Sequence, residues 1–236
     1  MANQKLDSTP SQSDVGGNLY PIKVWDITTR LFHWILVTLV TVSFVTAKIG
    51  ASTMLYHEWS GVAILVLVLF RIVWGFVGGR ESRFAAFVRG PASVLRYVST
   101  LFQRKPSRHL GHNPLGGWSV LILLISLLIQ ACTGLFANDD ILTEGPLFDL
   151  VSKDTSDWLT GIHHLNQTVL LGLICVHVCA ILFYVFFKGD NLIYPMFTGI
   201  KQWHQDAPFS QGNAWLAAAT ATLLAFTVYG LIYQIG

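Results

Sequence analysis

The chain has 236 residues, of which 53% are hydrophobic and 12% are charged, and its formal net charge is +2. A soluble globular domain carries about 25% charged residues, so this composition excludes that class and indicates an integral membrane protein. The length suffices for one helical bundle in a lipid bilayer with short tails. The charges are unevenly placed and give no sign of a nucleic-acid partner, so we expect none and take membrane lipid as the surroundings.

The first predicted segment is a polar tail at residues 1–20, which is rich in Ser, Asp, Asn and Gln. It contains no apolar run of the kind that a cleavable signal peptide needs. Its composition is typical of a disordered segment, because it offers little apolar surface to bury. Insertion into the membrane would then begin at the first apolar helix.

Two membrane helices are expected at residues 31–47 and 57–77, joined by a short link. Asp26 or Thr28 can cap the first helix, because a short polar side chain accepts a hydrogen bond from the first-turn amides. The chain reverses between the two helices, so the histidines near their starts lie at opposite membrane edges. Gly61 lies one turn into the second helix and would leave room for a flat ligand.

Three further membrane helices follow in chain order. They are expected at residues 118–137, 163–187 and 215–235, and each is long enough to cross a hydrocarbon core of about 30 Å. The connecting loop 78–117 is basic, and its stretches FAAFV and SVLRYVSTLF are typical of an amphipathic helix on the membrane surface. The connecting loop 138–161 is acidic.

The basic residues divide unevenly between the two sides of this bundle, and the richer side is expected to be cytoplasmic. With the N-terminus in the cytoplasm, the opposite side receives only Lys48 and Lys153. The cytoplasmic side receives Lys5, Lys23, Arg30, Arg80, Arg83, Arg89, Arg96, Arg104, Lys105, Arg108, Lys188 and Lys201. We therefore predict a multi-pass protein with a cytoplasmic N-terminus, whose acidic loop 138–161 faces the other side.

Two histidines, His163 and His177, share the fourth predicted helix. At 100° per residue, fourteen positions return the second imidazole to within about 40° of the first and raise it by about 21 Å. One helix thus presents two imidazoles on one face near opposite membrane edges, which suits two stacked metal macrocycles. His164 is the alternative to His163, but its spacing places it about 140° away from His177.

Two more histidines complete a pattern of pairs. His33 opens the first helix at the same edge as His177, and His57 opens the second helix at the same edge as His163. An ionisable residue inside a membrane is costly and usually functional. Bis-imidazole ligation of haem iron accounts for all four residues, whereas zinc or copper would need three or four ligands at one point. For any single histidine the alternative is a hydrogen-bonded residue at the interface.

Two arginines are candidates for contact with such a cofactor. Arg71 lies fourteen positions after His57 and close to the same face, where a guanidinium can pair with a haem propionate. Arg30 is placed to do likewise from the first helix. The alternative for both, and the favoured one for Arg30, is a side chain that extends to lipid phosphate.

The remaining histidines and the cysteines carry weaker signals. Three histidines lie in predicted loops and are expected to be solvated or to order those loops: His109, His112 and His204. Three cysteines lie in apolar runs without CxxC spacing: Cys132, Cys175 and Cys179. We predict that these cysteines are small buried hydrophobic residues without a disulfide or metal role.

Several motifs occur in order along residues 20–201: VWDITTRLFHW, HEWSGVAILVLVLFRIVWGFVG, RFAAFVRGP, LGHNPLGGW, TGLF and the histidine pattern of the fourth helix. In these motifs the chain resembles the bacterial cytochrome b561 family, which includes the b-type subunit of nickel–iron hydrogenases. The resemblance implies a four-helix transmembrane bundle that holds two b haems. It carries the ligand roles onto His33, His57, His163 and His177, in agreement with the depth argument.

The resemblance also implies a function in the bacterial inner membrane, namely electron transfer between the quinone pool and a redox partner such as a periplasmic c-type cytochrome or a hydrogenase. Candidates for the quinone site are the GHNPLGG turn, His112 and Arg71. The alternative function is a superoxide:quinone oxidoreductase, which would need a positive outer surface. The acidic outer loop instead suits a basic partner protein. A haem-free transporter would show broken helices or inverted repeats, and neither is clear.

Three parts of the chain are therefore expected: a polar tail at 1–20, a di-haem domain at 21–201, and a polar connector with a C-terminal transmembrane helix at 202–236. The predicted fold class is an all-α membrane protein, with a four-helix transmembrane bundle holding two haems and a fifth C-terminal transmembrane helix.

Overall fold

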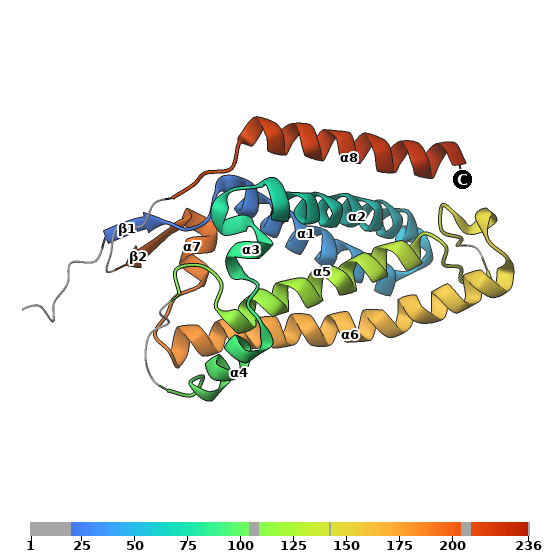
Figure 1. Cartoon of the computed structure of the whole chain (residues 1–236). Coiled ribbons are helices and arrows are strands. Elements are labelled where there is room, and N and C mark those ends of the chain that lie inside the picture. The colour runs from blue at the N-terminus through green and yellow to red at the C-terminus, as the bar shows by residue number, and fades with distance from the viewer. Residues whose placement is uncertain (1–19, 104–108, 142, 204–208, 236) are drawn as a thin grey trace, which may run out of the picture.

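The computed structural model describes residues 20–103, 109–141, 143–203 and 209–235 (Figure 1). Its long helices are α1 (Ile27–Ile49), α2 (Met54–Val77), α5 (Pro114–Gly134), α6 (Lys153–Phe186) and α8 (Ala214–Ile235). Within the described residues, these are the 5 helices long and apolar enough to cross a membrane. The predicted all-α membrane architecture is confirmed.

The four core helices pack in sequence order, with α1 along α2, α2 along α5 and α5 along α6. Helix α2 is central, since it also contacts α8. The buried core draws apolar side chains from all five long helices. Its large members include Phe32 of α1, Val68 and Trp74 of α2, Leu124 of α5 and Leu170 of α6. Val68 and Trp74 are 0% exposed, so α2 holds the bundle together.

The starts of α1 and α5 follow short polar caps. The Asp26 carboxylate accepts a hydrogen bond from the Thr29 amide at 2.7 Å, so Asp26 is the cap of α1. The Asn113 side chain accepts from the Gly116 amide at 2.7 Å, and Pro114 occupies the first turn. Because Asn113 caps the helix, α5 begins before the expected residue 118 and ends at Gly134 rather than near 137.

Helix α6 starts earlier than predicted. It begins at Lys153, where the Ser152 side chain caps it by accepting from the Thr155 amide at 3.3 Å. The prediction of a loop throughout 138–161 is therefore wrong in its last third, because polar turns preceding the apolar run also form helix. With 34 residues, α6 is about 51 Å long, which exceeds a hydrocarbon core of about 30 Å, so one end projects beyond the membrane.

Short elements cover the opposite end of the bundle. The predicted amphipathic region forms two helices, α3 (Phe84–Phe87) and α4 (Pro91–Ser99), which cross beside the start of α5 (Figure 1). A single turn of 3-10 helix, Arg80–Ser82, precedes α3. Two others lie elsewhere: Ala51–Thr53 joins α1 to α2, and Phe148–Leu150 lies in the loop between α5 and α6. Tyr97 of α4 shares a hydrogen bond with Tyr184 of α6, so α4 is fixed against the bundle.

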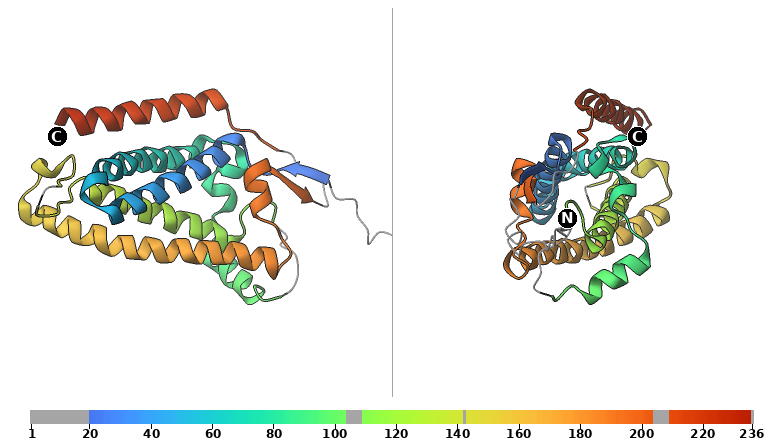
Figure 2. Two further views of the ribbon diagram at one scale, coloured as in Figure 1. Left: turned by 180° about the vertical axis from the view of Figure 1, so that it is seen from behind. Right: turned by 60° about the vertical axis from the view of Figure 1, so that its left-hand side comes forward.

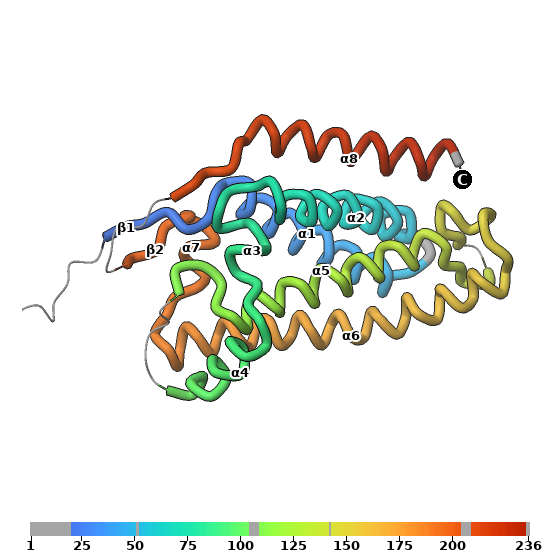
Figure 3. Tube along the Cα trace, viewed as in Figure 1, coloured from blue at the N-terminus to red at the C-terminus, as the bar shows by residue number. Residues whose placement is uncertain are grey.

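A small sheet was not predicted. Strand β1 (Tyr20–Lys23) pairs antiparallel with β2 (Ile200–Trp203), and α7 (Ile193–Thr198) leads into β2 (Figure 3). The strands have 4 residues each, which is too short for periodicity to reveal. The pairing joins the entry to α1 with the segment after α6, and both lie at the same end of the bundle.

The C-terminal helix α8 lies along α2, on the side of the bundle away from α6 (Figures 1 and 2). Its buried residues Ala217, Val228 and Ile232 face the core helices. The lead-in also packs closely, since a Cβ added to Gly212 would lie 2.3 Å from the Trp74 ring. Residues 209–213 and α8 are thus packed on the core bundle.

The cysteine prediction is wrong in one respect. Cys132, Cys175 and Cys179 are free thiols as expected, but their side chains are exposed on the helix surfaces rather than buried. In a membrane protein an apolar run faces lipid as readily as protein, so hydrophobic surroundings in the sequence do not imply burial within the chain.

Candidate functional site

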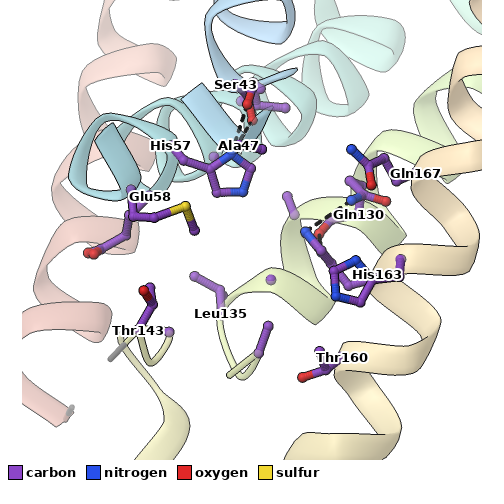
Figure 4. Close-up of a pocket in the computed structure, with 18 of the residues that line it drawn as sticks. Ser43, Ala47, His57, Glu58, Gln130, Leu135, Thr143, Thr160, His163 and Gln167 are labelled. Atoms are coloured by element: carbon purple, nitrogen blue, oxygen red, sulfur yellow. Dashed lines mark hydrogen bonds between the residues drawn. The ribbon is translucent and has the colours of Figure 1, made fainter. Parts of the chain in front are cut away.

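His57 of α2 and His163 of α6 face one cavity, which we call the cavity site (Figure 4). Their ring centres lie 6.2 Å apart, with the ring planes at 87°. The cavity has a volume of about 350 Å³ and is lined by α1, α2, α5, α6 and the loop that follows α5. This volume lies within the range of about 300–1,000 Å³ that is common for ligand pockets.

Backbone carbonyls orient both imidazoles of the cavity site. The Nδ1 atom of His57 lies 2.9 Å from the Ser43 carbonyl oxygen, and that of His163 lies 3.0 Å from the Gln130 carbonyl oxygen. A carbonyl can only accept, so each Nδ1 must carry the hydrogen and each Nε2 keeps its lone pair. Metal-ligating histidines are held in the same way.

The spacing of the two rings fits one metal ion between them. A metal ion between two imidazoles makes one bond of about 2 Å to a nitrogen of each ring. These two bonds, added to the distance from each nitrogen to the centre of its own ring, come close to the 6.2 Å between the ring centres. In the same cavity, the Nε2 atom of His163 accepts a hydrogen bond from the Gln130 side-chain amide at 3.1 Å. A metal ion bound to this Nε2 atom would therefore take the place of the Gln130 amide.

Glycines shape the cavity site. A Cβ on Gly61 would meet nothing within 4 Å, and Gly61 lines the cavity, as expected of a residue that leaves room for a flat ligand. A Cβ on Gly134 would lie 2.9 Å from the His163 ring, so α5 can approach His163 this closely only with glycine. His164, the alternative ligand, also lines the cavity but is exposed, and its ring centre lies 6.1 Å from that of His163.

The second pair lies at the other end of the bundle. His33 of α1 and His177 of α6 are within electrostatic reach of each other, although α1 and α6 have no extensive contact. The Nδ1 atom of His33 is buried and has no hydrogen-bond partner among the described residues. We call these two residues, with Arg71 and His112, the arginine site.

Arg71 is buried beside this pair. It is 3% exposed, and its guanidinium carbon lies 5.2 Å from the centre of the Phe84 ring and 5.9 Å from that of Phe87. Asp26 is near enough to attract its charge. Its Nη1 atom is buried and makes no hydrogen bond within the described part of the chain. A buried guanidinium with a free donor is suited to bind an anionic group.

His112 also belongs to this site, contrary to the expectation that it is solvated. Its ring packs between Trp25 and Phe87, with both centre distances 4.8 Å. Burial, together with the positive charges of Arg71, His177 and His33, lowers the pKa of His112 to about 3. The sequence held one signal of this placement, because Asn113 followed by proline puts His112 at the start of a membrane helix.

Arg30 has a different environment. Its Nη1 donates to the Phe197 carbonyl oxygen of α7, and the neighbouring Trp34 donates to the Met196 carbonyl oxygen at 3.1 Å. Trp34 also stacks on Phe197, with ring centres 4.4 Å apart. Arg30 therefore ties α1 to α7. Of the other two loop histidines, His109 packs against Tyr97, and His204 lies outside the described residues.

The loop beyond the cavity site is acidic, and its charges are partly paired. Lys153 forms ion pairs with Asp140, at 2.5 Å, and with Asp157. Further carboxylates line the cavity or lie exposed nearby: Asp139, Glu144, Asp149 and Asp154. The end of the bundle at which the cavity site lies therefore presents a negative surface.

Comparison with known proteins identifies the family. The family model of the prokaryotic cytochrome b561 matches residues 24–199, which include both histidine pairs. A probable Ni/Fe-hydrogenase B-type cytochrome subunit of Rhizobium leguminosarum bv. viciae is 24% identical, over 75% of this chain and 87% of that protein. The protein with the same printed name in Azotobacter chroococcum mcd 1 is 25% identical, over 79% and 91%.

A shorter match is the probable Ni/Fe-hydrogenase 1 B-type cytochrome subunit of Escherichia coli (strain K12), which is 27% identical over 47% of this chain and 57% of that protein. No solved structure matches the chain. The family match covers most of the chain and all four helices of the core bundle, and it confirms the resemblance found in the sequence motifs. The chain therefore belongs to the prokaryotic cytochrome b561 family.

Proposed function

We propose that this protein is a di-haem b-type cytochrome that transfers electrons between the quinone pool and a redox partner protein. Membership of the family implies haem b and electron transfer in a membrane. The observation that carries the finer proposal is the arrangement of four histidines as two pairs, one at each end of α6. Each pair draws its members from two helices, and His163 and His177 are about 21 Å apart along α6.

The residues of the cavity site would hold one haem through His57 and His163, and those of the arginine site the other through His33 and His177. Bound haem supplies an iron that alternates between ferric and ferrous states and so takes up single electrons. The backbone carbonyls of Ser43 and Gln130 fix the ring orientation in the first pair. Arg71 would pair with a haem propionate through its free Nη1 atom.

Arg30 was a second candidate for the propionate. Its Nη1 atom is engaged with the Phe197 carbonyl, while its Nε atom is buried without a partner among the described residues. We retain Arg30 as a cofactor contact through this second atom. For the quinone, the site we propose is the 111–117 turn beside the arginine site, where the buried Nδ1 atom of His112 has no partner in the described part of the chain.

We place the protein in the bacterial inner membrane, with the N-terminus in the cytoplasm. The support for this orientation is the distribution of basic residues, because the β1, α3 and α4 end of the bundle carries most of them. The cavity site and its acidic loop would then face the periplasm.

The redox partner is a protein that docks at one membrane face. The printed names of the relatives point to a nickel–iron hydrogenase. The acidic loop after α5 also suits a periplasmic c-type cytochrome with a basic patch, since opposite charges steer association. With a basic partner, we expect the rate of electron transfer to fall as salt is raised. A rate that is independent of ionic strength would reject charge-guided docking at this surface.

The test of the function uses purified protein in lipid vesicles that contain a quinol, with a soluble electron acceptor outside that cannot cross the membrane. We expect electrons to reach the acceptor in the wild type and not in His163→Ala or His177→Ala, because each substitution removes a ligand from one site. His164→Ala, which removes a neighbouring exposed imidazole, should transfer electrons normally. Transfer at the wild-type rate in His177→Ala would contradict the proposal.

A superoxide:quinone oxidoreductase is the alternative function. It would require positive charge around the site that receives the anion, and the loop over the cavity site is acidic. Superoxide-dependent reduction of quinone by the purified protein, at rates far above the uncatalysed reaction, would favour this alternative.

A further inference from the structure

An apolar groove runs between α2 and α5, on the half of the bundle that holds the arginine site. It has a volume of about 550 Å³ and is lined by Ile72, Phe76, Phe84, Ala85, Val88, Leu121, Leu124, Ile125 and Leu128. Every one of these side chains is a hydrocarbon. The groove therefore offers no side-chain hydrogen bond to a ligand along its length.

The short helix α3 closes one end of this groove and is fixed to both walls. The Phe84 ring packs directly over Gly75 of α2, where an added Cβ would lie 2.1 Å from the ring. Phe87 packs against Gly117 of α5, where an added Cβ would lie 3.1 Å from the ring. Side chains at either glycine would displace α3, so the groove has a fixed end wall rather than a movable loop.

The length of the groove matches one membrane leaflet. From Leu121 to Leu128, α5 advances about 10 Å, and half of the hydrocarbon core is about 15 Å thick. The groove is open towards the surrounding lipid, since Phe76 is 68% exposed and Ile125 is 57% exposed. It therefore has the dimensions and access to receive a single chain of a lipid in that leaflet.

Two arginines flank α3 at the closed end. Arg83 donates to the Gly78 carbonyl oxygen at 2.9 Å, which holds it at the end of α2. Arg89 lies beside α5, where the Trp118 indole donates to its carbonyl oxygen at 2.9 Å. Neither arginine forms an ion pair with a carboxylate among the residues that the structure describes. The Arg89 guanidinium donates to the Ala86 carbonyl oxygen of α3 at 2.8 Å. Both arginine side chains are exposed, and tryptophan is typical of the headgroup level, so we expect both guanidinium groups at the depth of the lipid phosphates.

We propose that this groove binds one anionic phospholipid, with an acyl chain between α2 and α5 and the headgroup between Arg83 and Arg89. Arginines whose charge is not neutralised by a carboxylate among the described residues favour an anionic headgroup over a zwitterionic one. A quinone is a poor occupant, because its ring oxygens would find no donor among the groove side chains. The inference depends only on the membrane location and not on the proposed redox function or orientation.

A bound lipid would also support the arginine site. Phe84 belongs to the groove wall and at the same time lies 5.2 Å from the Arg71 guanidinium carbon. An acyl chain in the groove would hold Phe84 in place and so help to keep Arg71 away from the bilayer.

The test compares binding of phosphatidylglycerol and phosphatidylcholine to the delipidated full-length protein by native mass spectrometry. We expect the wild type to bind one phosphatidylglycerol tightly, and Arg83→Gln/Arg89→Gln to bind it about thirty-fold more weakly, since each interfacial arginine contributes about fivefold. Arg96→Gln is the matched control, because Arg96 is an exposed arginine of α4, a helix that contributes no residue to the groove. It should bind like the wild type.

A second variant, Ala85→Trp, fills the groove and keeps both charges, so it tests the proposal even if the double variant does not fold. It should also lose the lipid. Equal binding by the wild type and the double variant, or equal binding of phosphatidylcholine, would overturn the proposal. The proposal would also be overturned if Ala85→Trp still bound the lipid. It would be overturned as well if the wild type co-purified with a quinone that was lost from these variants.

Discussion

The cavity site and the arginine site are built from the same residue type by different means. At the cavity site both imidazoles are oriented by backbone carbonyls, of Ser43 and Gln130, and open space lies between them. At the arginine site, His33 has a buried Nδ1 atom without a partner in the described residues. Its neighbours are a buried guanidinium and an imidazole whose pKa is lowered to about 3.

The difference indicates that the two sites would tune a bound cofactor differently. Hydrogen bonds that the imidazoles donate to fixed carbonyls set the orientation and basicity of the ligands at the cavity site. A positive charge in a region of low dielectric constant acts on the charge of the bound group at the arginine site. Changes to geometry should therefore affect the cavity site most, and changes to charge should affect the arginine site most.

Removal of a ligand should have the largest effect. We expect His163→Ala to lose the haem of the cavity site and His177→Ala that of the arginine site, so haem per chain should fall from two to one in each. The amount is measured by the pyridine haemochrome assay on purified protein. His164→Ala is the matched control and should keep both. Retention of both haems in His163→Ala or His177→Ala would reject the ligand assignment.

A large side chain in the cavity should reduce haem binding at the cavity site nearly as much as loss of a ligand, and should leave the arginine site unchanged. Gly61→Phe places a ring in the open space beside His57 without removing a ligand. We expect loss of one haem and unchanged absorbance from the other. Gly161→Ala, at an exposed position with nothing within 4 Å, serves as the control. Two haems in Gly61→Phe would show that the cavity is not the binding space.

Removal of the charge should act on the arginine site alone. Arg71→Gln should lower the midpoint potential of one haem by on the order of 60 mV, a tenfold change in a one-electron equilibrium, because a nearby positive charge favours the reduced form. Arg71→Lys retains the charge and should stay close to the wild type. A redox titration that separates the two haems measures this. Equal shifts of both potentials would contradict the separation of the sites.

The pH dependence of stability should report His112. Its pKa is about 3 in the folded protein against an ordinary value of 6.5, so the unfolded chain binds a proton that the folded chain does not. The free energy of unfolding should therefore fall as the pH is lowered below 6.5, by about 2 kcal/mol at pH 5. His112→Phe should lose this part of the dependence. Thermal unfolding of the wild type and of His112→Phe at pH 5 and above pH 6.5 tests this prediction. An identical loss of stability at pH 5 in the two proteins would contradict it.

The smallest effect is expected at Ser43. Its hydroxyl lies 3.1 Å from the His57 Nδ1 atom, but the backbone carbonyl of the same residue lies closer, at 2.9 Å. Ser43→Ala keeps the carbonyl, so haem should be retained and stability should change by about 0.5 kcal/mol or less. Loss of haem from this variant would show that the hydroxyl, and not the backbone, orients the ligand.

Much of the fold was predictable, because the length of each apolar run and the position of each histidine within its run can be counted in the sequence. The five membrane helices were placed within a few residues of their positions, apart from the polar start of α6. The sheet formed by β1 and β2 was missed, because two four-residue strands far apart in sequence have no periodic signal. The exposed cysteines were misplaced, since a hydrophobic side chain in a membrane can face either lipid or protein.

The sites divide in the same way. The closeness of His57 and His163 follows from depth, and the structure brings these two rings together. The packing of His112 between Trp25 and Phe87 does not follow from depth. The Asn113-Pro114 start of α5 places His112 at the end of a membrane helix, but its contacts with Trp25 and Phe87 depend on how α3 and the turn before α5 fold over the bundle, which is a long-range arrangement. Arg30 likewise lies against α7, an element that was not predicted.

The most direct measurement of the central claim is a dithionite-reduced minus oxidised spectrum of the purified protein, with haem quantified per chain. The two histidine pairs predict two b-type haems with the bands of bis-histidine ligation. One haem would show that one of the pairs is not a ligand set. Absence of haem would contradict the account and return all four histidines to a structural role.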